Sequence, residues 1–244
     1  MRFIAILPVR LQSSRLPGKA LKLIENIPAI VHTYKRTSLS KYLSDVYIAT
    51  DSKEIQEIAN KFNCKSILTK KHRNGSERIF EASKKLKYDY LINVQGDEVL
   101  IDPKNIDKMI LEIKKNKKEE FFIGVTDFKK INQKNVFKAV IDNKGYLLYC
   151  SREDIPSSHI TKNDNRLKVV FTVGFKKNSL EKFVRLQISK NEKREPNEFL
   201  RILDNDLKIK TVKFSKAQIS LDTKSDLKVL RQLIKKDKIM SKYY

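Results

Sequence analysis

The first hundred residues alternate between short apolar runs and amphipathic segments, and this alternation constrains the fold more than any other feature. Apolar runs occupy residues 4–7, 46–49 and 90–92, and residues 66–69, with two apolar residues at their centre, indicate a further short strand. Between them, residues 54–62 repeat apolar side chains at helical spacing, directly after residues that can cap a helix. Strands and helices that alternate at these intervals predict an α/β fold with a mostly parallel, doubly wound sheet.

The pattern changes after about residue 120, where the predicted strands become antiparallel. Residues 136–141 and 146–150 are apolar runs joined by Asp-Asn-Lys-Gly, a sequence typical of a hairpin turn. Helices are predicted at about residues 196–203 and at 224–234, where Asp222 can serve as a plain cap. In the first part of the chain, Ser76 is a candidate helix cap, and Arg36 is expected on the solvent side of a helix whose apolar face includes Ile30 and Tyr34. We therefore expect a single domain, 1–244, in three parts at about residues 1–120, 121–215 and 216–244.

The net charge is strongly positive, at +23 from 52 Lys and Arg against 29 Asp and Glu. Such an excess is compatible with a basic nucleic-acid-binding protein, which is the rival hypothesis from another functional class. The lysines are dispersed, however, and the sequence shows no zinc-finger spacing, no aromatic RNA-binding motif and no basic helix with heptads. We therefore expect no specific nucleic-acid partner, and the charge would instead attract anionic substrates.

No apolar run reaches the roughly 18 residues that a membrane-spanning helix needs, so we expect no membrane insertion. The apolar start of the chain is too short for a signal peptide. The two cysteines, Cys64 and Cys150, lie far apart and lack metal-binding spacing. Together these features predict a protein of the reducing cytoplasm.

A cluster of cations follows the first predicted strand. Arg10, Arg15 and Lys19 are separated by small and polar residues, and Pro17 with Gly18 imposes a turn. Arginine can bind phosphate oxygens with two parallel hydrogen bonds, and lysine adds a point charge. This pattern favours a polyphosphate ligand, with a solvated basic loop as the alternative.

A candidate metal ligand follows the predicted strand that ends near residue 94. Asp97 comes directly after Gln95 and Gly96, at the edge where ligands bind in open α/β sheets. A carboxylate there suits Mg²⁺, which is held by one or two carboxylates together with substrate phosphates. Arg78 is a further candidate, because it opposes the dipole of the helix whose first turn it occupies.

These motifs together resemble the 3-deoxy-manno-octulosonate cytidylyltransferase family, also called CMP-Kdo synthetases. The matches follow the family's order and cover nearly the whole chain. They are Pro8 and Arg10, Ser-Arg-Leu-Pro-Gly-Lys at 14–19, Ala-Thr-Asp at 49–51, Asn-Gly-Ser-Glu-Arg at 74–78, Asn-Val-Gln-Gly-Asp-Glu at 93–98, Tyr-Cys-Ser-Arg at 149–152 with Ile-Pro at 155–156, Leu-Arg at 200–201, and Asp222-Thr223 with Asp226-Leu227.

The resemblance implies a nucleotide-diphospho-sugar-transferase-like (Rossmann-like) fold. Nucleotide binding would belong to the first part, sugar binding and dimerisation to the antiparallel part, and metal binding to the closing segment. The implied reaction couples CTP to an acidic 2-keto-3-deoxy sugar, Kdo or a close analogue, and releases pyrophosphate. The resemblance also implies Mg²⁺ as the cofactor and a homodimer.

The resemblance assigns roles to individual residues of this sequence. The expected triphosphate ligands are Arg10, Arg15 and Lys19. The expected metal ligands are Asp97 and Asp222, and the expected catalytic residues are Arg10, Lys19 and Asp97. The residues expected to line the nucleotide and sugar pocket are Ser76, Arg78 and Gln95. The residue expected to bind the sugar carboxylate is Arg152.

One stretch departs from the family pattern. The family usually shows His-x-Gly-x-Tyr near residues 169–175, whereas this chain reads Val-Val-Phe-Thr-Val-Gly-Phe. Those positions lie near the sugar in the family, so the departure predicts an altered sugar preference and leaves the nucleotide unaffected. A CMP-nonulosonate (sialic-acid-like) synthetase is the alternative within the same superfamily, and an interaction module without catalysis is the remaining one.

Overall fold

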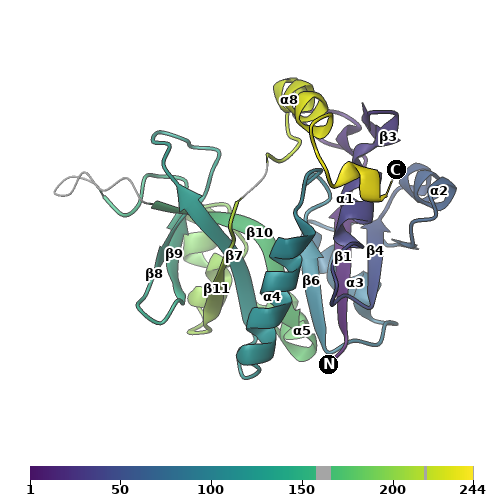
Figure 1. The fold of residues 1–244 in the computed structure, drawn as a ribbon. Coiled ribbons are helices and arrows are strands. Elements are labelled where there is room, and N and C mark those ends of the chain that lie inside the picture. The colour runs from purple at the N-terminus through teal and green to yellow at the C-terminus, as the bar shows by residue number, and fades with distance from the viewer. Residues whose placement is uncertain (158–165, 217–218, 244) are drawn as a thin grey trace. The chain divides into compact units, whose positions relative to one another are not determined.

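The computed structural model describes residues 1–157, 166–216 and 219–243, and Figure 1 shows their helices and strands. The chain forms two compact units. Unit 1 comprises residues 1–107 and 218–244, and unit 2 comprises residues 108–217. The closing segment of the chain therefore belongs to the same unit as the N-terminal strands.

The main sheet of unit 1 contains parallel strands, as predicted. β1 (Phe3–Val9) pairs with β6 (Tyr90–Val94) on one side and with β4 (Asp45–Thr50) on the other, and β4 pairs with β5 (Ser66–Leu68). All of β6 and the first six residues of β1 are buried, as expected for parallel strands covered on both faces. β1 includes Pro8, which extends it past the predicted end at residue 7.

Helices and a short hairpin complete unit 1. They are η1 (Lys19–Leu21), β2 (Leu23–Ile24), β3 (Ile27–Pro28), α1 (Ala29–Thr37), α2 (Lys53–Lys61), α3 (Gly75–Ser83), α8 (Lys224–Ile234) and η2 (Met240–Lys242). The predicted bounds of α8, residues 224–234, are confirmed at both ends. Thr223 and Asp226 form a capping box at its start. Helix α4 (Pro103–Lys115) begins in unit 1 and ends in unit 2.

Unit 2 contains the predicted antiparallel hairpin, β8 (Lys138–Ile141) with β9 (Leu147–Ser151). β10 (Arg166–Lys176) runs antiparallel to β7 (Phe121–Phe128) and to β8, while β11 (Ile209–Lys213) is parallel to β7. The remaining elements are α5 (Lys177–Arg185), α6 (Lys190–Arg194) and α7 (Leu200–Leu203). Stacked and edge-on phenylalanine rings, including Phe121, Phe175 and Phe183, form its core.

Three local predictions differ from the structure. Ser76 was a candidate cap, but the side chain of Asn74 accepts the hydrogen bond from the Glu77 amide, so Asn74 caps α3. Of the helix predicted at about 196–203, only the last turn forms, as α7, and α6 lies before the predicted range. Arg36 was expected on the solvent side of α1 but is only 2% exposed, because its guanidinium has buried partners.

No helix of the described ranges has the length and apolar character required to cross a membrane.

Candidate functional site

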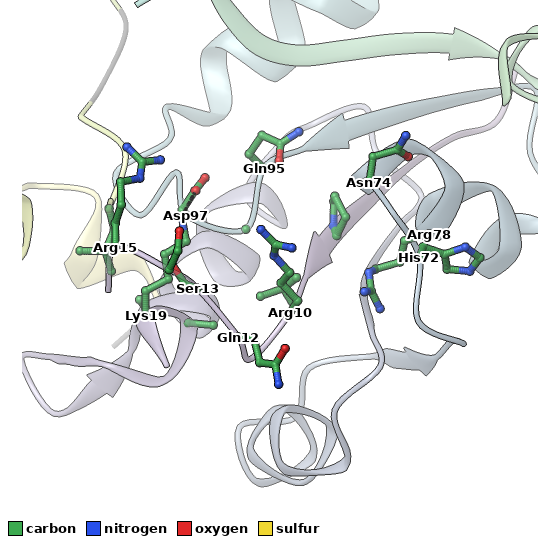
Figure 2. Close-up of a pocket in the computed structure, with 18 of the residues that line it drawn as sticks. Arg10, Gln12, Ser13, Arg15, Lys19, His72, Asn74, Arg78, Gln95 and Asp97 are labelled. Carbon is green, nitrogen blue, oxygen red and sulfur yellow. Dashed lines mark hydrogen bonds and ion pairs between the residues drawn. The ribbon is translucent and has the colours of Figure 1, made fainter. Parts of the chain in front are cut away.

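A cavity of about 280 Å³ lies in unit 1 at the carboxyl ends of β1 and β6. The loop after β1, the start of α3 and the loop after β6 form its walls. Figure 2 shows Arg10 near the centre, Arg15 and Lys19 on the side of Asp97, and Arg78 with His72 on the other side. The structure thus brings together most of the predicted site residues, which come from distant parts of the sequence.

The glycine after β6 brings this loop close to β1. A Cβ atom at Gly96 would lie 3.1 Å from the Pro8 carbonyl oxygen and 3.2 Å from Val9 Cβ. The Gly96 carbonyl also accepts a hydrogen bond from Thr33 Oγ1 on α1, at 3.1 Å. Close approach, rather than a left-handed backbone, is therefore what this position requires, and it places Asp97 at the mouth of the cavity.

Lys19 lies between two carboxylates. Its Nζ donates to Asp97 Oδ2 at 2.5 Å and to Asp222 Oδ1 at 3.0 Å, and Arg15 Nη2 lies 2.9 Å from the same Asp222 oxygen. Burial alone would lower the pKa of Lys19, but attraction and hydrogen bonds from Asp97 and Asp222 outweigh it and raise that pKa. Lys19 is therefore a protonated cation that joins two acidic residues.

Asp222 does not cap α8. Thr223 is the N-cap residue, and its side chain accepts from the Asp226 amide. The Asp222 carboxylate is therefore available to the cations of the basic loop, although it was considered as a plain cap from the sequence. The backbone supports this position, because the Leu221 N–H donates to the Asp97 carbonyl at 2.9 Å.

Arg78 has a counterion of its own. Its guanidinium is 3.1 Å from Asp51 Oδ2 and donates to Thr69 Oγ1 at 2.8 Å, with only 4% of the side chain exposed. This pair explains how an arginine is accommodated in the first turn of α3. Ser76 is buried next to it and is not among the residues that line the described cavity.

Several lining residues were missed in the sequence. They are Gln12, Ser13, His72, Arg73 and Asn74. His72 contacts Glu81 through Nε2 and lies 3.8 Å from Glu77, so the two acids hold the imidazole at the cavity wall. The available signal was the uninterrupted polar run that precedes α3.

Arg152 belongs to unit 2, at the end of β9. Its Nη1 donates to the Lys134 carbonyl at 3.2 Å, and its guanidinium carbon lies 4.6 Å from the centre of the Phe137 ring. These contacts order the side chain within unit 2. Its expected contact with a sugar carboxylate stays a prediction.

The donor set at Lys19 fits a magnesium ion bound together with a phosphorylated ligand. Among the described residues, no group of three or more His, Cys, Asp or Glu could hold a metal by itself. Asp97 and Asp222, however, already direct oxygens toward one cation, the Lys19 ammonium. Two carboxylates completed by phosphate oxygens and water are the usual protein environment of Mg²⁺.

Comparisons with known proteins identify the family of this chain. The sequence profile described as cytidylyltransferase matches residues 4–239. The 3-deoxy-manno-octulosonate cytidylyltransferase of Chloroherpeton thalassium is 38% identical over 97% of this chain and 99% of its own length. The mitochondrial enzyme of that name from Arabidopsis thaliana is 34% identical over 96% of this chain and 83% of its own length.

Solved structures show the same relationship. The structure of CMP:2-keto-3-deoxy-manno-octonic acid synthetase complexed with CTP superposes with a TM-score of 0.93, at 27% identity, over 97% of this chain and 99% of that one. A 4-diphosphocytidyl-2C-methyl-D-erythritol synthase from Anaerococcus prevotii shares the fold, with a TM-score of 0.62 at 16% identity over 96% of each chain. The α/β fold expected from the resemblance is confirmed. The chain belongs to the cytidylyltransferase family, within the branch of the 3-deoxy-manno-octulosonate cytidylyltransferases.

Proposed function

We propose that this protein transfers the cytidylyl group of CTP to Kdo. The anomeric hydroxyl oxygen of the sugar forms a bond to the α-phosphorus of CTP, and the bond from that phosphorus to pyrophosphate breaks. The hydroxyl proton passes to solvent, and CMP-Kdo and pyrophosphate are the products. The observation that carries this proposal is the unit 1 cavity, which is lined by Arg10, Arg15, Lys19 and Asp97. Asp222 is outside that lining but pairs with Lys19 and Arg15.

The cavity supplies what phosphoryl-type transfer demands of a protein. Such reactions depend on positioning and on neutralisation of charge more than on a protein nucleophile. Arg10 and Arg15 offer planar donor groups for phosphate oxygens, and Lys19 offers a point charge. Arg78 and Gln95 line the same cavity and would contact the nucleotide and the sugar.

The activity is proposed to depend on Mg²⁺. Asp97 and Asp222 would hold the ion, and Lys19 would then turn from the two carboxylates toward the phosphates. When bound, the ion would neutralise charge on the triphosphate and polarise its oxygens. Both carboxylates are about a quarter exposed, so a hydrated cation can reach them.

The sugar preference is proposed to be Kdo with relaxed selection at the distal hydroxyls. The glycine of the family's His-x-Gly-x-Tyr pattern corresponds to Gly174 of β10, so Thr172 and Lys176 stand where the family usually places His and Tyr. A site that loses hydrogen-bonding partners loses discrimination at the hydroxyls they would have met. Arg152 would still read the carboxylate, because a cation suffices for that contact.

We further propose a cytoplasmic homodimer that uses unit 2. In the described part of the chain, β9 itself pairs with β8 alone, and the bridge between Tyr146 and Lys210 lies just before it, so most of its other edge is unpaired. Leu148 on that strand is 56% exposed. An open edge with an exposed large apolar residue favours association with a second copy. Light scattering after size exclusion tests this, and a monomer at micromolar concentration would contradict it.

Pyrophosphate release in a substrate panel tests the function. CTP, UTP, ATP and GTP are each combined with Kdo, with Kdo analogues altered at the distal hydroxyls, and with a sialic acid. We expect release with CTP and Kdo, weaker selection among the analogues than among the nucleotides, and none with sialic acid. Strict preference for unaltered Kdo at full efficiency would refute the relaxed selection, and turnover with another nucleotide would refute the CTP assignment.

A matched pair of variants links this activity to the cavity. Arg15→Ala removes a lining cation, whereas Arg2→Ala removes an exposed arginine of the same unit that pairs with Asp45 instead. Only Arg15→Ala should raise the KM for CTP, by about tenfold, the loss expected for one charge-assisted contact. Equal effects of the two substitutions would indicate a general loss of positive charge.

A further inference from the structure

The helix α1 carries a buried polar face that the proposed reaction does not use directly. His32, Thr33, Arg36 and Thr37 are each at most 2% exposed. Buried polar groups are costly unless they are hydrogen-bonded, so their partners show what the helix holds. Apart from bonds within α1 and one to the Ile24 carbonyl, those partners lie on the loop after β6, which carries Asp97, and on the segment after α8, the helix that Asp222 precedes.

Arg36 bonds to both of these segments at once. Its Nε donates to the Ile101 carbonyl at 2.8 Å and its Nη2 to the Leu100 carbonyl at 3.2 Å, on the loop that begins with Gln95 and contains Asp97. Its Nη1 donates to the Asp237 carboxylate, just beyond the end of α8. Since Asp222 immediately precedes the cap of α8, this helix connects Arg36 to the second carboxylate.

Further contacts make the connection rigid. Thr33 on the same helix binds the Gly96 carbonyl, next to Asp97. His32 Nε2 lies 2.8 Å from the Ile24 carbonyl and must donate to it, so in the neutral ring Nδ1 accepts from the Tyr243 hydroxyl at 2.9 Å. Figure 1 shows the C-terminal turn beside α1. The apolar core that includes Leu100, Leu221, Leu230 and Ile234 joins these segments.

We propose that Arg36 is a positioning residue that sets the relative placement of Asp97 and Asp222, and through it the affinity for the metal. This inference rests on the proposed magnesium-dependent function. Only arginine presents several N–H donors in a rigid plane, so one side chain can hold two carbonyls and a carboxylate together. Lysine has the charge but not this planar arrangement of donors.

The test compares Arg36→Lys and Asp237→Asn with the unmodified protein. Replacing a group that orients the metal ligands without contacting the metal lowers metal affinity by about 10- to 100-fold. We expect the half-saturating Mg²⁺ concentration to rise about tenfold or more, with kcat at saturating Mg²⁺ largely kept. Calorimetric titration of Mg²⁺ into the protein with CTP, without sugar, should show the same weakening independently of turnover.

A buried arginine of unit 2 supplies the matched control. Arg201 is 2% exposed, pairs with Glu192 and donates to the Leu186 carbonyl, so Arg201→Lys disturbs a comparable network. It should lower the melting temperature without changing Mg²⁺ affinity. Unchanged Mg²⁺ affinity in both Arg36→Lys and Asp237→Asn, or an equal loss in Arg201→Lys, would overturn the inference.

The outcomes separate this inference from the proposed function. Absence of metal-dependent pyrophosphate release in the unmodified protein would refute the proposed function itself. Metal-dependent release in the unmodified protein, with normal Mg²⁺ affinity in the variants, would refute only the role of Arg36. If Arg36→Lys does not fold, the Mg²⁺ affinity of Asp237→Asn tests the role of Arg36 instead. This substitution keeps the shape of the Asp237 side chain and removes only its charge.

Discussion

Replacement of Lys19 by methionine should destabilise the free protein and at the same time create a binding site for Mg²⁺ in the absence of nucleotide. The Lys19 ammonium lies 2.5 Å from Asp97 Oδ2 and 3.0 Å from Asp222 Oδ1, so these two oxygens are no more than about 5.5 Å apart. Lys19→Met keeps an unbranched side chain of similar length but removes the positive charge between the two carboxylates.

The size of the effect follows from this distance. Two unit charges about 5.5 Å apart repel by about 3 kcal/mol at an effective dielectric constant of about 20. Arg15 still neutralises part of the Asp222 charge, and both carboxylates are partly exposed, at 23% and 28%, so solvent screens the remainder. We therefore expect a loss of about 1–2 kcal/mol, which lowers the melting temperature by about 2–8 °C in a chain of this size.

Thermal melting with and without millimolar Mg²⁺, in the absence of nucleotide, is the assay. Mg²⁺ should raise the melting temperature of Lys19→Met, because a ligand that binds only the folded state stabilises it, and should leave the unmodified protein nearly unchanged. Lys65→Met is the control, since Lys65 pairs with the single carboxylate of Asp45 in the same unit. A Lys19→Met protein as stable as the unmodified one and indifferent to Mg²⁺ would refute the reasoning.

Three other predictions follow from charge and burial. Asp97→Asn and Asp222→Asn should each lower pyrophosphate release by about 100-fold or more with unchanged circular dichroism, because each removes a hard oxygen charge beside the phosphates. Burial lowers the pKa of His32, so below about pH 6.5 the unfolded chain binds a proton that the folded chain excludes. The free energy of unfolding should therefore decrease as the pH is lowered below about 6.5, by at most about 1.4 kcal/mol per pH unit, until the pH reaches the pKa of His32 in the folded protein. Urea titrations of His32→Gln should not show this contribution. DNA binding in gel-shift assays should be weak and should be lost between low and physiological salt. Tight, sequence-dependent binding would contradict the prediction that the dispersed positive charge has no specific nucleic-acid partner.

Features that depend on neighbouring residues could be predicted from the sequence. The ends of α8 follow from polar residues that can cap a helix and from apolar residues at helical spacing, all within about a dozen positions, whereas the structure was needed to show that Thr223 rather than Asp222 is the cap. The parallel strands of unit 1 follow from short apolar runs that recur between helices. The loop cations and Asp97 could be placed at one edge of the sheet because parallel strands end at the same edge.

Features that depend on distant partners could not be predicted in this way. Arg36 follows Lys35 in a helix with an apolar face, so the local pattern predicts a solvent-exposed side chain. In the structure the side chain is buried, and its partners include Asp237, which lies 201 positions later. The choice of Asn74 over Ser76 as the cap of α3 depended on which side chain reached the Glu77 amide. Both residues are good caps, and their spacing alone does not distinguish them.

The carboxylate pair shows why the site could not be predicted from neighbouring residues alone. Asp222 meets Lys19 across 203 positions of sequence, and it does so only because the closing segment of the chain returns to unit 1. Bringing two like charges together is unfavourable unless a cation lies between them and the backbone holds them in place. Lys19 provides the cation, and Arg36 bonds to two carbonyls on the Asp97 segment and to the Asp237 carboxylate beyond α8. The proximity of Asp97 and Asp222 therefore depends on a cation that neutralises the pair and on contacts between segments that are distant in the sequence.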